Sequence, residues 1–548
     1  MSYFPEVDQP YYLSNFHTLL RWVEQRYDDL LLPKEHDFLD IFRQLSVESQ
    51  CLLVRMLMRT KLHFRYSKLV YPEIGNIDVA VKELCLYELV VVDPVVDIEI
   101  VTGQMLKAEL ITCFGHDLLL PKASKKQLSE QLYECYGLQS KKHWSKWAVG
   151  LDDPLIQLQC QDMFDCLCLM FFGNPYQDLT EFVLTDLGLF RYETIPFDDS
   201  TRAFQNRQQI DFYRQLLISR EFLEQDLPDQ AFDSLPAPID SDWLNQKRDK
   251  TLYRIGYEFE RKSDFDQALS CYLDNDYRRA RERHIRVLEK QQRYEEAFQL
   301  CEQALAEPLD ENEQQSCQKM IKRLARKVAR KVSIAVVAPI EQHTCQLSYG
   351  PEPVELLAAE SLTSQVQQAI YVENSLFNGL FGLTFWEAVF KPYPGAFFHP
   401  FQSAPHDLYT TDFASTRARE IAAGWERMQQ PDYHQWLADR YLDKYGIANP
   451  FVNWSVIDET LLRLVQRCIP IQHLKTIFER ILFDIKSNSS GFPDLVVFDR
   501  CQSCYRLVEV KGPGDRLQDN QIRWFDYFIR HQIPASVLYV QWQNDANR

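Results

Sequence analysis

The sequence has no apolar run long enough to cross a bilayer. Its most hydrophobic stretch, residues 89–101, is interrupted by one proline and three acidic residues, whereas a membrane-spanning helix needs about 20 predominantly apolar residues. Residues 1–10 are polar and acidic rather than basic and then apolar, so no secretory signal is expected either. These absences predict a cytoplasmic protein without a membrane partner.

Positive charge is also scarce. The chain has 60 Lys and Arg against 78 Asp and Glu, which gives a net charge of −18 at pH 7. This balance argues against a protein that coats nucleic acid with its whole surface, so any site for a polyanion must be a local basic surface. It does not exclude an enzyme whose site gathers carboxylates around metal ions.

Two pairs of cysteines at zinc-ligand spacing are missing as well. The 14 cysteines are scattered along the chain, which favours reduced thiols over a disulfide framework. Cys501 and Cys504 form a single C-x-x-C motif without a second pair, so a turn is favoured over a metal knuckle at this point.

Helical periodicity is abundant in the first two thirds of the chain. At 548 residues the chain is too long for one ordinary core, so several domains are expected. Apolar residues recur every three or four positions in 11–27 and 36–58, which predicts helices. Beyond residue 251 a Tyr, Phe and Ala pattern recurs at less than the about 34 residues of a tetratricopeptide repeat, so a degenerate array of helical hairpins is expected.

Two short β-strands are predicted near the C-terminus. Residues 494–498 and 507–510 are rich in β-branched and apolar side chains, and the turn-like segment 500–504 separates them, so they are expected to pair as a hairpin. Because side chains alternate along a strand, Glu509 and Lys511 emerge on the same face.

These strands carry charge in an apolar setting. Charged residues at strand ends are usually solvated, so exposure to water without any function is the default explanation for them. However, the residues around Asp494, Glu509 and Lys511 are nearly all apolar, and interior strands accommodate stray charges only at a cost. Two carboxylates and an ammonium at one sheet edge can bind a divalent metal and a water.

The motif formed by these residues resembles a known nuclease signature. P-D-x14-E-V-K, followed by a predicted helix at 517–530 that carries Gln521, is similar to the PD-(D/E)xK nuclease superfamily. The tighter string E-V-K-G-P-x-D-R-L-x-x-x-Q resembles its VRR-NUC branch. Taken with the helical region before it, the whole chain resembles the Fanconi-associated nuclease family of the bacterial type.

The resemblance implies a multidomain, mainly α protein with a C-terminal α/β nuclease domain, in which helices flank a mixed central sheet. The expected divisions are an N-terminal helical region, a SAP-like DNA-binding domain, a TPR-like helical domain and a VRR-NUC nuclease domain with its catalytic core at 450–548. Their expected ranges are 1–70, 71–200, 201–345 and 346–548.

The resemblance also implies the site residues. The expected catalytic residues are Asp494, Glu509, Lys511, Glu373 and Gln521. The expected ligands of Mg²⁺ or Mn²⁺, two ions per site, are Glu373, Asp494, Glu509 and the carbonyl of Val510. Lys511 would orient or help to deprotonate the attacking water, and Gln521 would orient the water or Lys511.

The acid that completes this site is less well defined by the sequence than the others. Residues 354–370 are predicted as a helix, and Glu373 matches the family position ahead of an almost uncharged helix. Glu387 is the alternative candidate, but its position predicts an acid on the surface of a helix.

Several basic residues are candidate phosphate contacts, although a solvated surface is the default explanation for each of them. Ser124 and Gln127 form a capping-box pattern, so lysines crowd a helix N-terminus, which favours anions. Arg516 either contacts phosphate or caps its turn. Arg480 and its basic neighbours in the helix before Asp494 are the local candidates. Besides Arg480, the residues expected to bind DNA are Lys122, Lys125, Lys126, Lys141, Lys142, Lys475, Lys486 and Arg516.

The function implied by the resemblance is metal-dependent, structure-specific cleavage of branched DNA such as 5′ flaps, by endonuclease and exonuclease action, in interstrand crosslink repair. A monomer is expected, with a dimer on DNA as the alternative, at the nucleoid of a bacterium or in the nucleus of a eukaryote. No Cys/His cluster of the ubiquitin-binding type is present, so no ubiquitin binding is expected. Two alternatives stay open: a Holliday-junction-resolvase-like nuclease and a non-catalytic DNA-binding scaffold.

Overall fold

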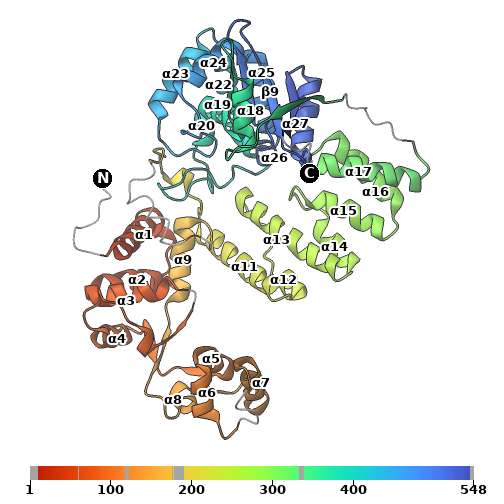
Figure 1. Cartoon of the computed structure of the whole chain (residues 1–548). Coiled ribbons are helices and arrows are strands. Elements are labelled where there is room, and N and C mark those ends of the chain that lie inside the picture. The colour runs from red at the N-terminus through yellow and green to blue at the C-terminus, as the bar shows by residue number, and fades with distance from the viewer. Residues whose placement is uncertain are drawn as a thin grey trace. The chain divides into compact units, whose positions relative to one another are not determined.

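The computed structural model describes residues 10–59, 61–117, 123–175, 177, 191–331 and 339–543. The chain divides into two compact units, Met1–Leu189 and Phe190–Arg548, and each is described by itself (Figure 1). Within the described residues, none of the helices combines the length and the hydropathy that crossing a membrane would require.

The N-terminal unit begins with a helical bundle. Its helices are α1 (Tyr11–Tyr27), α2 (Pro33–Gln44), α3 (Val47–Leu57), α4 (Ile77–Leu86) and α9 (Gln161–Phe172). The expected helix at 36–58 is in fact two helices. The chain turns between them, and the Ser46 side chain accepts a hydrogen bond from the N–H of Ser49, which starts a new helix.

A three-stranded sheet adjoins this bundle. Its order is β1 (His63–Arg65), β5 (Leu155–Leu158) and β2 (Val90–Val92), with both pairs antiparallel. The sheet therefore joins residues on both sides of the expected boundary at residue 70.

A second small core lies within the segment between β2 and β5. Its elements are β3 (Val95–Asp97), α5 (Ile98–Gln104), α6 (Lys107–Phe114), α7 (Lys125–Tyr136), β4 (Lys141–His143) and α8 (Trp144–Trp147). As the capping-box pattern predicts, Ser124 and Gln127 exchange hydrogen bonds at the start of α7.

The second unit opens with the expected helical array. Its helices are α11 (Arg207–Glu224), α12 (Pro228–Asp233), α13 (Asp242–Arg261), α14 (Phe265–Tyr272), α15 (Ala280–Lys290), α16 (Tyr294–Ala306) and α17 (Glu311–Lys327). Successive helices pack against each other and enclose two apolar clusters. The sequence prediction of paired helices in this region is confirmed.

A five-stranded mixed sheet forms the centre of the nuclease domain. Its order is β6 (Glu341–Leu347), β10 (Ala535–Trp542), β9 (Cys504–Lys511), β8 (Leu495–Asp499) and β7 (Gln367–Tyr371). The pairs β6–β10 and β10–β9 are parallel, and β9–β8 and β8–β7 are antiparallel. The predicted hairpin and the predicted mixed sheet are both confirmed.

Two expectations about this domain are corrected. Residue 345, the expected end of the helical domain, lies inside β6, which is part of the nuclease sheet. The helix expected at 354–370 ends early as α18 (Val354–Leu362), and the remainder forms β7. The hydroxyls of Thr363 and Ser364 accept hydrogen bonds from the N–H groups of Ala369 and Gln367, which turns the chain out of the helix.

Strand alternation divides the core into two layers. Leu495 and Val497 face the smaller cluster that includes the α18 side chains, whereas Val496 and Phe498 face the larger cluster on the other side. The larger side is covered by α19 (Leu376–Thr384), α20 (Trp386–Val389), α21 (Phe413–Thr416), α22 (Ala418–Met428), α23 (Tyr433–Lys444), α24 (Glu459–Cys468), α25 (Ile471–Phe483), α26 (Ile485–Asn488) and α27 (Asp519–Arg530).

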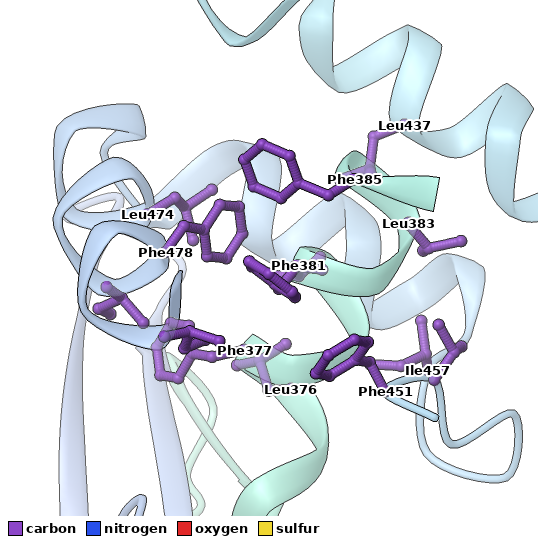
Figure 2. Close-up of a cluster of buried hydrophobic side chains, with 14 of the residues drawn as sticks. Leu376, Phe377, Phe381, Leu383, Phe385, Leu437, Phe451, Ile457, Leu474 and Phe478 are labelled. Atoms are coloured by element: carbon purple, nitrogen blue, oxygen red, sulfur yellow. The ribbon is translucent and has the colours of Figure 1, made fainter. Parts of the chain in front are cut away.

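The almost uncharged helix α19 lies at the middle of this larger layer. All nine of its residues are buried, and Figure 2 shows Phe381 and Phe385 pointing toward Phe478 of α25. Gly379 lets another segment approach closely, because a Cβ there would come within 2.7 Å of Ile457. The packing fixes α19, and with it the turn that carries Glu373.

Candidate active site

The β8–β9 hairpin brings the two predicted acids onto neighbouring strands. The backbone N–H of Val510 donates to Oδ2 of Asp494 at 2.9 Å. The carbonyl of Asp494 in turn accepts from the N–H groups of Val372 and Glu373, at 2.9 and 3.0 Å. Asp494 is thereby tied on one side to β9 and on the other to the chain that follows β7.

Glu509 lies inside the sheet with only 1% of its surface exposed. Its Oε1 is 2.8 Å from Nζ of Lys511, as expected for two residues on one face of a strand. The same oxygen accepts from Nε2 of Gln521 on α27. Oε2 is buried and has no hydrogen-bond partner among the described residues.

The amide of Gln521 is held in its orientation by the start of its own helix. Its Oε1 accepts from the backbone N–H of Gln518 at 2.9 Å, in a capping box, while its Nε2 reaches Glu509. The sequence analysis predicts that Gln521 orients the water or Lys511. In the structure its amide donates to Glu509, which also pairs with Lys511.

Burial dominates the electrostatics of the acid pair. It raises the pKa of Asp494 to about 6, against the opposing effect of the Val510 N–H. Burial and the neighbouring Asp494 raise the pKa of Glu509 to about 7, and Lys511 partly offsets this. Two acids with raised pKa values beside one ammonium are typical of a functional site rather than of a structural ion pair.

Of the two candidates for a third acid, Glu373 influences this pair, whereas Glu387 pairs with an arginine. Glu373 lies in a 3-10 turn before α19, and its carboxylate accepts from Tyr371 Oη and Asn374 Nδ2. Its charge contributes to raising the pKa values of Asp494 and Glu509. The competing Glu387, by contrast, is an exposed residue of α20 that pairs with Arg440 at 2.5 Å.

Glu355 was missed by the sequence analysis. It lies in the first turn of α18, and its charge raises the pKa of Asp494 more than that of Glu373 does. The sequence carries one signal for it, because Glu355 is an acid in the first turn of the helix predicted at 354–370. The family motif, however, points to Glu373.

The donor set fits a divalent metal ion. Among the described residues, no three His, Cys, Asp or Glu side chains lie close enough together to hold a metal by themselves. However, Oε2 of Glu509 is a buried oxygen that accepts no hydrogen bond from the described residues, whereas Oε1 of the same carboxylate is used by Lys511 and Gln521. The Val510 carbonyl is on the same side of the strand as its N–H, which faces Asp494. Carboxylate and carbonyl oxygens are the ligands that Mg²⁺ and Mn²⁺ prefer.

Aromatic packing supports the start of β8. Phe492, two residues before Asp494, stacks on Trp524 of α27 with ring centroids 4.2 Å apart, and it also contacts Phe377 of α19. Gly491 has φ +89°, and a Cβ there would come within 2.8 Å of Asn520. Residues 491–492, just before β8, therefore pack closely against the N-terminal part of α27, where Gln521 lies.

The predicted basic residues of this unit have different surroundings. Lys475 is part-exposed and pairs weakly with Glu479 at 3.9 Å, and Arg516 is exposed in the loop after β9. Arg480 is corrected as a phosphate candidate, because it is buried and pairs with Glu311.

Lys486 belongs to a wider basic surface that the sequence did not reveal. Burial and the charges of Arg278 and Arg279 lower the pKa of Lys486. Burial and the charges of Arg220, Lys486, Arg254 and Arg278 lower the pKa of Lys250. Arg254 and Arg279 also line a cavity of about 580 Å³. Arg278 itself is largely buried and pairs with Asp310 and Asp484. We call the exposed set Lys250, Arg254, Arg279 and Lys486 the array basic surface.

The predicted lysines of the N-terminal unit are at its surface. Lys125 and Lys126 begin α7, and Lys141 and Lys142 are exposed on β4. The ammonium of Lys142 lies 4.5 Å from the centre of the Trp147 ring. Lys122 lies outside the described residues.

Comparison with known proteins agrees with this architecture. Residues 10–91 match the model described as FAN1, HTH domain, and residues 428–542 match the VRR-NUC domain. The chain is 39% identical over 547 residues to the Fanconi-associated nuclease 1 homolog of Pseudomonas aeruginosa, covering 99% of this chain and 98% of that protein. It is 27% identical to the homolog of Arabidopsis thaliana, covering 96% of this chain and 67% of that protein.

Solved structures give the same result. The crystal structure of paFAN1 bound to 5′ flap DNA with a 2-nucleotide flap and a gap matches with a TM-score of 0.86 and 38% identity, covering 99% of this chain and all of that chain. The complex with a 1-nucleotide flap matches with a TM-score of 0.84 and 38% identity, covering 98% of this chain and 99% of that chain.

Proposed function

The chain belongs to the Fanconi-associated nuclease family, and we propose that it hydrolyses phosphodiesters beside 5′ flaps in branched DNA with Mg²⁺ or Mn²⁺. One observation carries the proposal. The buried pair Asp494 and Glu509 has raised pKa values and leaves one oxygen of Glu509 without a partner, beside the ammonium of Lys511.

The residues of the site have distinct roles in this proposal. Asp494, Glu509 and the carbonyl of Val510 would hold a divalent ion, with Glu373 and Glu355 as the acids available to a second one. When bound, such an ion supplies a Lewis acid and a water of lowered pKa.

Lys511 and Gln521 would orient the water and the Glu509 carboxylate, and Lys511 would also offset negative charge on the phosphate. Lys511 favours the ionised form of Glu509 and offers an ammonium that can orient the attacking water and offset charge on the phosphate. Gln521 holds Oε1 of Glu509, so that Oε2 remains the oxygen for the ligand.

The DNA contacts are proposed from charge and from the relatives. The array basic surface and the lysines at Lys125, Lys126, Lys141 and Lys142 provide local positive charge in an acidic protein, which is what binding to a phosphate backbone requires. The matched structures of paFAN1 contain 5′ flap DNA. We propose the same substrate here, together with a role in crosslink repair at the chromosome, in the nucleoid of a bacterial cell.

The test is cleavage of an end-labelled 5′ flap by the wild type, Asp494→Ala and Glu387→Ala, with Mg²⁺, Mn²⁺ or EDTA. We expect cutting near the junction that needs metal, is lost in Asp494→Ala and persists in Glu387→Ala, which removes an exposed acid of α20. Cutting that survives Asp494→Ala would overturn the site. Binding without cutting in the wild type would indicate a DNA-binding scaffold.

Glu355 can be tested against a neighbour on its own helix. Glu355→Gln should weaken cleavage at limiting metal by about tenfold if its carboxylate serves the metal site. The matched control is Glu360→Gln, which removes an exposed acid of α18. Equal activity of the two variants at every metal concentration would exclude Glu355 from the site.

A further inference from the structure

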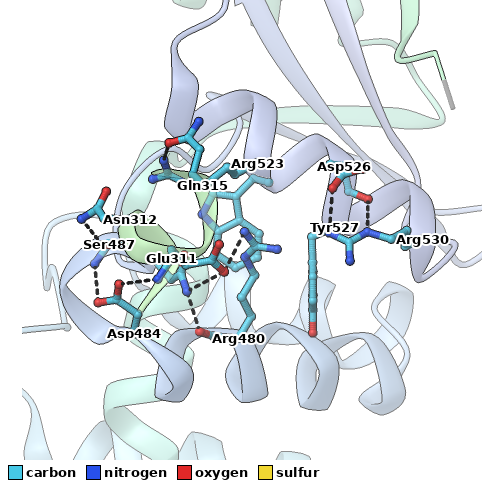
Figure 3. Close-up of polar contacts among 12 residues, drawn as sticks. Glu311, Asn312, Gln315, Arg480, Asp484, Ser487, Arg523, Asp526, Tyr527 and Arg530 are labelled. Atoms are coloured by element: carbon cyan, nitrogen blue, oxygen red, sulfur yellow. Dashed lines mark hydrogen bonds and ion pairs between the residues drawn. The ribbon is translucent and has the colours of Figure 1, made fainter. Parts of the chain in front are cut away.

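Helix α17, the last helix of the array, contacts the nuclease domain along one polar stripe. Three of its residues, each four positions apart and hence on one helix face, form this stripe: Glu311, Gln315 and Lys319. Asn312, next to Glu311, also donates to Oγ of Ser487 at 3.4 Å. Figure 3 shows Glu311 and Gln315, with the ribbon of α17 beside the nuclease helices. We call the set Glu311, Gln315 and Lys319 the α17 stripe.

All three contacts lead to α27. Oε1 of Gln315 accepts from Nη1 of Arg523 at 3.2 Å. Nζ of Lys319 lies 3.8 Å from the carboxylate of Asp519, at the start of α27. The contact is therefore antiparallel: later residues of the α17 stripe contact earlier residues of α27.

Glu311 reaches α27 through an intermediate residue. Its Oε1 is 3.1 Å from Nη2 of Arg480 on α25. The guanidinium of Arg480 in turn lies over the rings of Trp524 and Tyr527 on α27, at 4.8 and 4.4 Å from their centres. Arg480 is thus held between the acid of the array and two aromatic residues of the nuclease helix.

Burial identifies Glu311 as the strongest of the three contacts. The side chains of Glu311 and Arg480 are 9% and 4% exposed, whereas Lys319 and Asp519 are 66% and 71% exposed. An exposed pair of that kind contributes little, but a buried charge that loses its partner is strongly disfavoured. Glu311 is also anchored by its own backbone, since its N–H donates to Asp484.

The helix held in this way carries two supports of the acid pair. Gln521 lies between Asp519 and Arg523 on α27 and donates to Glu509. Trp524, under the guanidinium of Arg480, stacks on Phe492 just ahead of Asp494. A shift of α27 would therefore move a support of each acid.

We propose that Glu311 is a positioning residue for the nuclease reaction: through Arg480, the array holds α27 so that Gln521 and Trp524 keep Glu509 and Asp494 aligned. The inference rests on the proposed function for the roles of those acids, and it adds that the array helps to build the active site besides presenting a basic surface.

The chain offers a matched control for this idea. Glu313 lies in the same first turn of α17 and is also buried, with 1% of its side chain exposed against 9% for Glu311. Its carboxylate pairs with Arg281 of α15 at 2.6 Å, inside the array. Neutralising Glu313 should disturb the array about as much as neutralising Glu311, but without breaking a contact to the nuclease domain.

The experiment compares the full-length wild type, Glu311→Gln and Glu313→Gln. Single-turnover cleavage of a 5′ flap with Mn²⁺, the Kd for the same flap in Ca²⁺, and amide hydrogen exchange of residues 519–530 are measured for each. We expect Glu311→Gln to lower the single-turnover rate by about tenfold, with Kd changed by less than about twofold and faster exchange in α27. Glu313→Gln should leave the rate and the exchange of α27 near those of the wild type.

Two results would overturn the proposal. One is an unchanged rate and unchanged α27 exchange in Glu311→Gln, and the other is an equal loss in both variants, which would indicate general destabilisation. If Glu311→Gln does not fold, Gln315→Ala breaks the next contact of the stripe and decides the question by the same two measurements. If the wild type fails to cut the flap, the proposed function is wrong, and the exchange of α27 still tests the coupling.

Discussion

The backbone N–H of Val510 donates to the carboxylate of Asp494 at 2.9 Å, across 16 positions of sequence. The bond attaches the acid that precedes β8 to the strand that carries Glu509 and Lys511. It also uses one oxygen of Asp494 and leaves the other for a ligand. Because a main-chain group makes this contact, substitution of neighbouring side chains should leave it in place.

Gln521 provides the most direct test of how Glu509 is held. Gln521→Glu keeps an oxygen for the N–H of Gln518 and so keeps the helix cap, but it replaces the donor to Glu509 with a second negative charge. We expect cleavage to fall by about 10- to 100-fold, as for other residues that orient a metal ligand. Single-turnover rates at saturating DNA measure this.

Gln521→Ala serves as the comparison, because it removes both the cap and the donor. If capping were the main role of Gln521, the Ala variant would be impaired and the Glu variant would cut DNA like the wild type. That outcome would contradict the prediction.

The raised pKa of Asp494 predicts that the metal-free protein becomes less stable as the pH rises. The native state favours the protonated acid, with a pKa of about 6 against 3.8 for an ordinary Asp. Between these values the native state binds more protons than the unfolded state, so stability falls with increasing pH. Asp494→Asn removes this effect and should stabilise the protein by about 1 to 3 kcal/mol at pH 8 in EDTA, with no gain below pH 4.

Asp499, at the other end of β8, is a control of opposite sign. Hydrogen bonds from the N–H groups of Gln502 and Cys501 lower the pKa of Asp499. Its contribution to stability is therefore present above the unfolded pKa and is lost as the pH falls through the folded one. Asp499→Asn should destabilise the protein at neutral pH. Urea unfolding from pH 3.5 to 8 gives the free energy of unfolding of both variants. If the change relative to the wild type varied with pH in the same direction for both, the pKa shifts of opposite sign would be contradicted.

The buried phenylalanines of α19 should carry much of the stability of the nuclease domain. Phe381 is fully buried, and its ring contacts those of Phe385, Phe451 and Phe478 (Figure 2). Phe381→Ala should lower the free energy of unfolding by about 3 to 5 kcal/mol, because it leaves a cavity in a packed cluster.

The control for this substitution is Phe483→Ala at the end of α25. Phe483 is 46% exposed, so its removal should change the free energy of unfolding by no more than about 0.5 kcal/mol. Chemical denaturation followed by tryptophan fluorescence gives both values. Equal shifts in the two variants would show that α19 is not the stabilising centre.

The array basic surface should bind DNA through phosphate charge rather than sequence. Arg279→Ala and Lys486→Ala should each weaken flap binding to a similar degree for any base sequence, and each should reduce the slope of log K against log salt by about 0.9. Arg323→Ala is the control, because Arg323 belongs to the same array but forms two hydrogen bonds with Glu289. Fluorescence anisotropy over a range of salt concentrations tests this, and an unchanged slope in all three variants would remove the surface from the DNA path.

The alternation of side chains along a strand made the centre of the site predictable. Placing Glu509 and Lys511 on one face requires only the period of two, and pairing them with Asp494 requires only a short turn. Both relations join residues that are close in sequence. The capping box at Ser124 and the helix α1 were predictable for the same reason.

Predictions that needed contacts between distant segments failed or were not made. The helix predicted at 354–370 included residues 367–370, whereas the formation of β7 there depends on pairing with β8, more than 120 residues away. Arg480 looked like a free cation beside the active strand, but Glu311 of the array buries it. Glu355 gained significance only when folding brought α18 near Asp494.

The sequence by itself therefore determined the local chemistry of this protein: which acids and which lysine share a strand face, and where helices begin. The tertiary structure alone decided which residues surround that chemistry, including Gln521 on Glu509 and the α17 stripe on α27. The physical reason is that strand alternation and helix capping depend on neighbouring residues. The burial that raises the pKa values of the acids and orders α27 depends on segments that meet only in the folded chain.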